Sequence, residues 1–197
     1  MTATAAAIPP KARDADPDPY RLRRYPSRLV ERVTLRDGRS VLVRPILPQD
    51  ADLEQNFFAQ LAPQTRQRRF HFGVNLLPPE VVRGFAEIDY HTHLALVAEA
   101  VDSDEQPMLV ADARYVVRAG SDSAEFAIVV ADAWQRVGLG RDLMQRLAGQ
   151  ARRDGVRVLL GDVLTHNQPM LTLARALGAR VVPHRHEASL QQARWVL

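Results

Sequence analysis

Apolar residues recur at two spacings along the chain, and each spacing predicts one kind of element. Short apolar or alternating runs predict strands at residues 93–101, 109–117, 125–130, 157–164, 181–182 and 190–196. Apolar residues at helical spacing predict helices that start near Asp50, Gln64, Pro79, Leu139 and Met170. We therefore predict an α/β (α+β) fold with a mixed, mostly antiparallel central sheet and helices on both faces.

The beginning of the chain shows neither the strand spacing nor the helix spacing of apolar residues. Residues 1–27 mix Ala, Pro and charged residues without a period, so we predict a disordered tail. The remaining residues, 28–197, are predicted to form one domain because splitting them would leave each half with a small core. Asp37-Gly38 lies between two strand-like runs and predicts the turn of a hairpin.

One stretch combines a strand, a glycine-bearing turn and a helix. The strand-like run from Glu125 to Val130 is followed by Gln135-Arg136-Val137-Gly138-Leu139-Gly140-Arg141, and helical spacing begins at Leu139. The N-terminus of a helix directs backbone N–H groups and a positive dipole end at one spot, which attracts anions. Two glycines let a bulky anion approach the backbone, and two arginines add positive charge. The stretch predicts a site for a phosphate or pyrophosphate.

Two common phosphate motifs do not fit this turn. A P-loop needs a second glycine followed by Lys and Ser or Thr, and that pattern is absent. A dinucleotide fingerprint needs a third Gly or Ala three residues after Gly140, where the chain has Leu143. From the residues alone, an ordinary turn before a helix stays open as the alternative.

Composition narrows the function classes. Cys is absent, which excludes disulfides, thiolate zinc sites and a cysteine nucleophile. No apolar run reaches the length of about 18 residues that would predict a membrane span, and the start lacks a basic leader for secretion, so we expect a cytoplasmic protein. His91, His93, His166, His184 and His186 form no recognisable ligand set with carboxylates, so we predict no metal.

Positive charge is concentrated near the start of the predicted domain. The formal net charge is only +3, yet eight arginines fall between Arg21 and Arg44, with Glu31 and Asp37 as the acids. This segment is either a solvated edge or a docking surface for an acidic partner. No nucleic-acid motif accompanies it, so a nucleic-acid partner is not expected.

The glycine turn, residues 135–140, resembles the acyl-CoA loop of the GNAT N-acetyltransferases, where it holds the CoA pyrophosphate. Arg44-Pro45 resembles the family's entry to its first helix. Asn167 to Met170, with Leu173 to Gly178, resembles its second CoA-side helix. Arg69-Phe70, Ile88-Asp89-Tyr90 and Ala124-Glu125-Phe126-Ala127 are similar, more narrowly, to the catalytic domain of bacterial Pat-type protein lysine acetyltransferases.

The resemblance implies a GNAT fold and acetyl-CoA as co-substrate, with no metal. It implies an acetyl-CoA-dependent N-acetyltransferase whose acceptor is a primary amine, plausibly a protein lysine. The alternatives are a small-molecule amine acetyltransferase or a non-catalytic acyl-CoA-binding regulator. The cofactor-binding residues that it implies are Ile128, Val129, Val130, Gln135, Arg136, Val137, Gly138, Leu139, Gly140, Arg141 and Asn167.

Two positions bear on the chemistry that the resemblance implies. A lysine amine with a pKa near ~10.4 is only about 0.04% neutral at pH 7, so a general base accelerates its attack. Glu125 stands where Pat-type enzymes carry their catalytic Glu, and its alternative is an exposed carboxylate at a strand end. Ala174 stands where many GNAT enzymes carry a Tyr that protonates the leaving thiolate, so that role is either vacant or unnecessary. The acyl-chain preference and oligomeric state are not predicted.

Overall fold

The computed structural model describes residues 25–71 and 77–197. Within these residues the strands form one sheet, in the order β1-β2-β3-β4-β5-β6-β8-β7. Neighbouring strands run antiparallel except for β5 and β6, which run parallel. The strands are β1 (Glu31–Thr34), β2 (Ser40–Pro45), β3 (His93–Val101), β4 (Pro107–Val117), β5 (Ser123–Val130), β6 (Val158–Leu164), β7 (Arg180–Pro183) and β8 (Leu190–Val196). The predicted mixed, mostly antiparallel sheet is confirmed.

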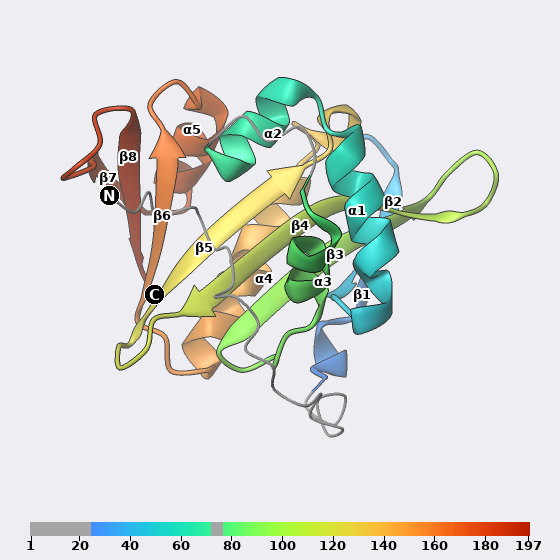
Figure 1. The fold of residues 1–197 in the computed structure, drawn as a ribbon, viewed down its shortest axis with the longest axis horizontal. Coiled ribbons are helices and arrows are strands. Elements are labelled where there is room, and N and C mark those ends of the chain that lie inside the picture. The colour runs from blue at the N-terminus through green and yellow to red at the C-terminus, as the bar shows by residue number, and fades with distance from the viewer. Residues whose placement is uncertain (1–24, 72–76) are drawn as a thin grey trace.

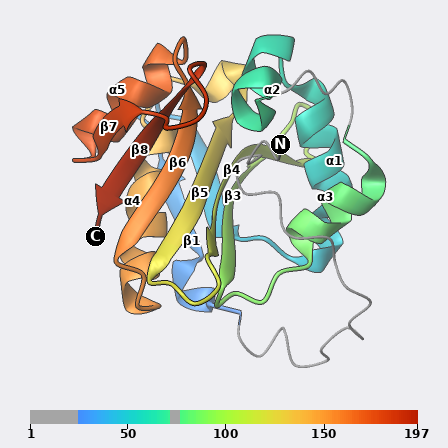
Figure 2. The same ribbon diagram turned by 60° about the vertical axis from the view of Figure 1, so that its left-hand side comes forward.

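Helices cover both faces of this sheet, as predicted (Figure 1). In the turned view, one face carries α1 (Ala51–Gln60), α2 (Pro63–Phe70) and α3 (Pro79–Ala86), and the other carries α4 (Leu139–Arg153) and α5 (Gln168–Ala176) (Figure 2). Three short 3-10 helices complete the described chain: η2 (Ser27–Leu29), η3 (Pro48–Asp50) and η4 (Asp132–Trp134). No helix among residues 25–71 and 77–197 is long and apolar enough to cross a bilayer.

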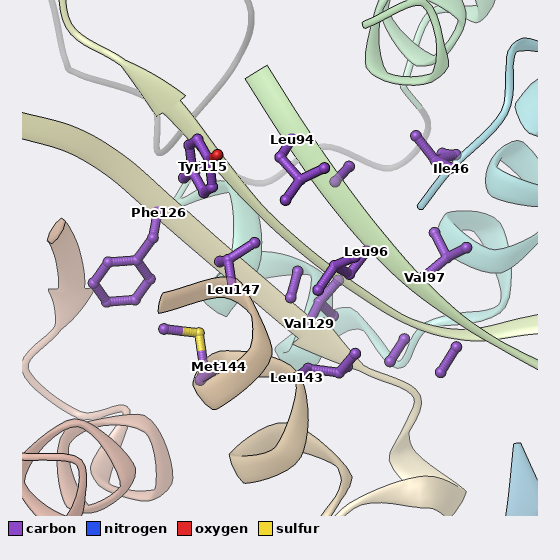
Figure 3. Close-up of a cluster of buried hydrophobic side chains, with 14 of the residues drawn as sticks. Ile46, Leu94, Leu96, Val97, Tyr115, Phe126, Val129, Leu143, Met144 and Leu147 are labelled. Carbon is purple, nitrogen blue, oxygen red and sulfur yellow. The ribbon is translucent and has the colours of Figure 1, made fainter. Parts of the chain in front are cut away.

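The helix α4 packs on the sheet through an apolar stripe (Figure 3). Leu139, Leu143, Met144 and Leu147 recur at helical spacing, and each is at most 1% exposed. They lie against the side chains of β3, β4 and β5 that point to this face, such as Tyr115. This burial fixes the start of α4 against β5, which holds the glycine turn in place.

The start of the described chain is packed rather than free. The Tyr25 hydroxyl donates to the Pro45 carbonyl at 3.2 Å, and its ring meets Tyr90 edge-on at 5.5 Å. Tyr25, which the sequence assigned to the tail, therefore contacts the domain. The rest of the predicted tail lies outside the described residues, and Arg21, Arg23 and Arg24 lie there too.

Arg44 and Asp50 form an ion pair between β2 and η3. Arg44 donates to both carboxylate oxygens of Asp50, at 2.6 and 2.9 Å, and also to Glu99 at 2.8 Å. Asp50 stands at the N-cap position of α1 but makes no side-chain cap bond to that helix. Its carboxylate instead accepts from Arg44 and from the backbone N–H of Leu47 at 2.7 Å.

A buried charged cluster supports α1 and α3 on the sheet. Arg114 on β4 is fully buried and donates to Asp112, to Glu54 of α1 and to the Phe85 carbonyl of α3. Arg69 of α2 is 3% exposed and faces the same carboxylates. The face that carries α1 to α3 is therefore held partly by charges, unlike the apolar face under α4.

Candidate active site

The parallel strands β5 and β6 part soon after they meet. Their pairing covers only Ser123–Val158, Ala124–Leu159 and Glu125–Leu160. Beyond Glu125, β5 continues to pair with β4 as far as Val130. A gap therefore opens between β5 and β6 toward their carboxyl ends.

The β4–β5 register decides which backbone groups face this gap. Ala131 N–H donates to the Val110 carbonyl at 2.8 Å, and hydrogen-bonded pairs alternate with non-bonded pairs along an antiparallel ladder. Val129 is opposite Asp112, so its backbone groups face β4. The backbone groups of Ile128 and Val130 face the gap. Of the three strand residues expected to offer backbone groups, two have the required orientation.

A cavity of about 530 Å³ passes through the gap. Residues of the glycine turn and of α5 line it on one face of the sheet, and residues of α2 line it on the other. We call the part beside residues 135–141 the loop end and the part beside α2 the acceptor end. The acceptor end is lined by Thr65, Arg68, Arg69, His71 and Asp162.

The loop end is built from glycine geometry and a helix start. Gly138 has a φ of 96°, in the left-handed region that glycine adopts without strain, and it is the N-cap of α4. The N–H groups of the first residues of α4 have no acceptor within the helix. Gln135 crosses to β5, where its Nε2 donates to the Val130 carbonyl at 3.0 Å. The turn therefore presents backbone donors next to the gap, as an anion requires.

The β1–β2 hairpin joins this end of the cavity, which the sequence did not predict. Arg36 N–H donates to the Val137 carbonyl at 3.2 Å, and the Arg36 Nε lies 3.4 Å from where a Cβ on Gly138 would stand. Arg39 fixes the hairpin by donating to the Ala133 carbonyl at 2.9 Å and by lying 3.9 Å from the centre of the Trp134 ring. Part of the arginine-rich segment thus folds against the glycine turn.

Most of the predicted cofactor-binding residues meet at the cavity. Val137 and Leu139 do not line it, because the Val137 carbonyl faces Arg36 and the Leu139 side chain is buried under α4. Asn167 lines the cavity and also caps α5, since its Oδ1 accepts from Met170 N–H at 3.4 Å. The lining residues among those predicted are Ile128, Val129, Val130, Gln135, Arg136, Gly138, Gly140, Arg141 and Asn167.

Glu125 lies beside the cavity rather than in its wall. Its side chain is 25% exposed, and its Oε1 accepts two hydrogen bonds from Arg118, at 3.0 and 2.6 Å. Side chains alternate along β5, so Glu125, Ala127 and Val129 point to the α2 face. Glu125 therefore stands at the start of the gap, on the same face as the acceptor end.

Asp162 and His71 were missed by the sequence analysis. Asp162 stands on β6 on the α2 face, and its Oδ1 accepts from Gln192 at 3.4 Å. His71 ends α2 with a φ of 62°, and burial lowers the pKa of its ring against an opposing effect of Asp162. A lone acid inside the apolar run of residues 158–164 was the available signal for Asp162.

Three residues that the sequence analysis named lie outside the cavity. Tyr90 is buried and donates to the Ile46 carbonyl at 2.8 Å, so it belongs to the core. Ala174 is buried in α5 and does not line the cavity, while His166 is exposed outside it. No group of three or more His, Cys, Asp or Glu in the described part of the chain is arranged to hold a metal ion.

This arrangement agrees with a comparison against family models. The sequence matches the model of the "Acetyltransferase (GNAT) family" over residues 54–179. The chain belongs to the GNAT acetyltransferase family. It is accordingly an acyltransferase, and the family uses acetyl-CoA as co-substrate. The cavity fits that co-substrate in having a turn with backbone donors at one end and strand backbone that faces the gap beside it.

Individual GNAT relatives are similar over most of the chain. Acetyltransferase PA5475 of Pseudomonas aeruginosa is 34% identical over 145 residues, which cover 74% of this chain and 77% of the relative. Acetyltransferase Pat of Mycolicibacterium smegmatis is 32% identical over 149 residues, covering 75% of this chain but only 43% of Pat. The solved GNAT domain of S. lividans PAT has a TM-score of 0.79 and 27% identity, covering 88% of this chain and 99% of that domain. The similarity to a Pat-like catalytic domain is thereby confirmed.

Proposed function

We propose that this GNAT acetyltransferase transfers the acetyl group of acetyl-CoA to the side-chain amine of a protein lysine. The observation that carries the transfer is the cavity that joins the glycine turn to the opposite face through the gap between β5 and β6. A thioester and an amine that enter from opposite faces would meet inside the gap, which fixes their orientation. The protein acceptor rests on the similarity to the catalytic domains of the Pat proteins.

At the loop end, three cations and the helix start would hold the phosphates. The backbone N–H groups at the start of α4 would donate to the pyrophosphate. Arg136 and Arg141 line the cavity beside them, and Arg36 approaches from the hairpin. Guanidinium groups suit this task because they form paired, charge-assisted hydrogen bonds to phosphate oxygens.

In the gap, β5 would bind and polarise the thioester. The backbone groups of Ile128 face the gap, where no strand of the described chain pairs with them, so its N–H would donate to the thioester carbonyl as negative charge develops there. The Val130 carbonyl already accepts from Gln135. Asn167 would donate its side-chain amide to the pantetheine arm from the α5 side, while its Oδ1 caps that helix.

Glu125 would act as the general base. Its carboxylate stands on the acceptor face where the gap begins, and it would take the proton of the attacking amine through an intervening water. The neutral amine nitrogen then forms its bond to the thioester carbon, the carbon–sulfur bond breaks, and the second proton of the nitrogen passes to solvent water. The thiolate leaves with its electron pair, and no side chain at Ala174 assists it.

The function is tested by an acetyl-transfer assay with labelled acetyl-CoA. One set of reactions supplies folded proteins and lysine-containing peptides, and a second supplies polyamines and free amino acids. Preferred labelling of protein lysines supports the proposal. Preferred labelling of a small amine would instead establish the alternative, and thioester consumption without amine labelling would contradict both.

A further inference from the structure

Asp162 is a nearly buried carboxylate in the cavity wall that has few partners. Its side chain is 12% exposed. The Oδ1 atom accepts one hydrogen bond, from Gln192 Nε2 at the long distance of 3.4 Å. The Oδ2 atom lies 3.9 Å from His184 Nε2, which is beyond hydrogen-bond distance.

A charge in this position is costly without a partner. An ionised carboxylate offers about four acceptor sites, and removing it from water is unfavourable unless hydrogen bonds or an opposite charge replace the lost solvent. Within the described residues, the ion-pair contact of Asp162 is that with His184. Asp162 therefore retains unused capacity to bind a donor, and this capacity faces the cavity.

The His71 ring does not neutralise Asp162. His71 faces it from the end of α2, and burial lowers the pKa of that imidazole, so the ring is uncharged at neutral pH. The Nδ1 atom of His71 has no hydrogen-bond partner among the described residues. Glu187 adds a second negative charge near the same ring, and Arg69 faces the buried carboxylates of Asp112 and Glu54. Arg68 also lines this end of the cavity but forms no ion pair with Asp162 among the described residues, so the Asp162 carboxylate is the anionic group that an entering cation would meet.

The position of Asp162 relates it to the reacting groups. Glu125 is paired with Leu160, and side chains alternate along a strand, so Glu125 and Asp162 point to the same face. Asp162 lies two residues beyond that last pair, on β6, across the gap from β5. An amine that enters from the α2 face meets Asp162 on β6 and Glu125 on β5.

We propose that Asp162 binds the ammonium group of the acceptor, with His71 and His184 beside it, and so selects primary amines that arrive protonated. This inference rests on the proposed acetyl transfer. The ammonium donates one N–H to the Asp162 carboxylate, whose ion-pair contact within the described residues is the long one with His184. Asp162 is a substrate-binding residue, whereas Glu125 receives the proton.

Binding of a lysine side-chain mimic tests the site without turnover. Butylammonium is titrated into the CoA-loaded protein while the amide signals of Gly161 and Val163 are followed by NMR, with butan-1-ol as the uncharged ligand of the same shape. We expect the wild type to bind butylammonium, and Asp162→Asn to bind it roughly 10–100-fold more weakly, because a charge-assisted hydrogen bond is lost. Asp162→Glu should restore part of the affinity, and Asp104→Asn, an exposed loop substitution, should match the wild type.

Steady-state kinetics with the best primary amine supply the second readout. We expect Asp162→Asn to raise the KM for the amine roughly 10–100-fold with a much smaller change in kcat, since the group that it removes binds the ground state and the transition state alike. Acetyl-CoA affinity and the melting temperature are measured on the same samples to verify the fold and the loop end.

The outcomes separate this inference from the proposed function. Equal butylammonium binding by wild type and Asp162→Asn, or no binding by either, would overturn the role of Asp162 even if acetyl transfer is observed. A fall in kcat at unchanged KM would make Asp162 the base and would also overturn it. If no amine is acetylated, the proposed function fails, while the butylammonium titration still decides whether Asp162 binds a cation.

Discussion

The two ends of the cavity differ in whether backbone groups or side chains line them. The loop end uses backbone: a glycine with a φ of 96°, the start of α4 and strand groups that face the gap. The acceptor end uses side chains from separate elements, among them His71 of α2 and Asp162 of β6. A cluster of backbone donors can be made by local chain geometry, whereas a cluster of side chains from separate elements exists only after the fold brings them together.

The supports beneath the two ends differ in the same way. Under the loop end, α4 buries an apolar stripe that includes Leu143 and Leu147. Next to the acceptor end, the buried charges of Arg114, Asp112 and Glu54 link β4 to α1. Apolar packing tolerates small adjustments of shape, but buried charges are stable only while every partner is present.

The largest expected effect is on the acceptor face, at Glu125. Changing Glu125 to Gln keeps the size of the side chain and removes the proton acceptor. If Glu125 is the base, kcat at neutral pH should fall by roughly 10²–10⁴-fold with acetyl-CoA affinity retained. The defect should shrink at high pH, where more of the amine is already neutral. Rates measured from pH 6.5 to 9.5 check this expectation.

Arg118 supplies the control for that experiment. It donates two hydrogen bonds to the Glu125 carboxylate, and its side chain is 45% exposed. If Glu125 serves only to hold Arg118, then Arg118→Gln should produce the same loss as Glu125→Gln. Wild-type turnover by Glu125→Gln at pH 7 would return Glu125 to the role of a strand-end carboxylate.

The sequence predicted the loop end of the cavity better than the acceptor end. The order of the strands and helices came from apolar spacing, and the loop end came from glycines, arginines and a helix start that are adjacent in the chain. Asp162, His71 and Arg36 are separated by tens of residues, and only the tertiary fold brings them to one cavity. Glu54, Arg69 and Arg114 belong to types that are usually exposed, so no periodicity identified them as a buried cluster.

A pair of substitutions compares the two supports. Arg114→Met leaves Asp112 and Glu54 buried without their shared partner, so we expect a loss of about 3–5 kcal/mol in the free energy of unfolding. Leu147→Ala under α4 should cost about 2–5 kcal/mol through lost packing. Urea denaturation measures both.

The loss of stability in Arg114→Met should be partly reversed by further substitutions. Adding Asp112→Leu and Glu54→Leu to Arg114→Met should recover much of the stability, since an apolar group of similar volume can replace a buried ion network. A triple variant that is no more stable than Arg114→Met would show that packing in this region, rather than unpaired charge, sets the loss.

At the loop end, we expect smaller effects on acetyl-CoA affinity. Gly138→Val places a branched side chain at a φ of 96° and next to Arg36, so affinity should fall roughly 10–100-fold. Gly149→Val in α4, where a Cβ would meet nothing within 4 Å, is the matched control and should keep the wild-type affinity. Equal affinity in all three proteins would remove the glycine turn from the site.

Arg36 should contribute less because it is exposed. We expect Arg36→Gln to weaken acetyl-CoA binding about 3–10-fold at low salt, and less at high salt, where exposed charges are screened. Comparing acetyl-CoA with acetyl-dephospho-CoA identifies the phosphate involved. If Arg36 binds the 3′-phosphate, then Arg36→Gln should lose affinity for acetyl-CoA only. If Arg36 binds the pyrophosphate, then Arg36→Gln should lose affinity for both acetyl-CoA and acetyl-dephospho-CoA. No loss with either ligand would exclude Arg36 from binding.

The last effect concerns acid stability near the acceptor end, and it is spread over several pH units. His93 on β3 is buried, its Nε2 has no partner within the described residues, and burial, aided by Arg114, lowers its pKa to about 3. Because the unfolded imidazole titrates near ~6.5, the unfolded state binds more protons between these values, and stability falls as the pH drops through that window. The contribution is at most about 1.4 kcal/mol per pH unit.

His93→Leu isolates this contribution from other acid-sensitive groups. Asp89 accepts the His93 backbone N–H at 2.9 Å. Burial raises the pKa of the Asp89 carboxyl, but its hydrogen bonds to Thr92 and to backbone N–H groups outweigh burial and hold that pKa below its usual value. Protonation of Asp89 therefore lowers the stability of the protein only at a lower pH than the titration of His93 in the unfolded chain. Between pH 6.5 and 5.0, the unfolding free energy of the wild type should therefore decline more steeply than that of His93→Leu. Parallel slopes for the two proteins would mean that His93 titrates alike in the folded and unfolded chains.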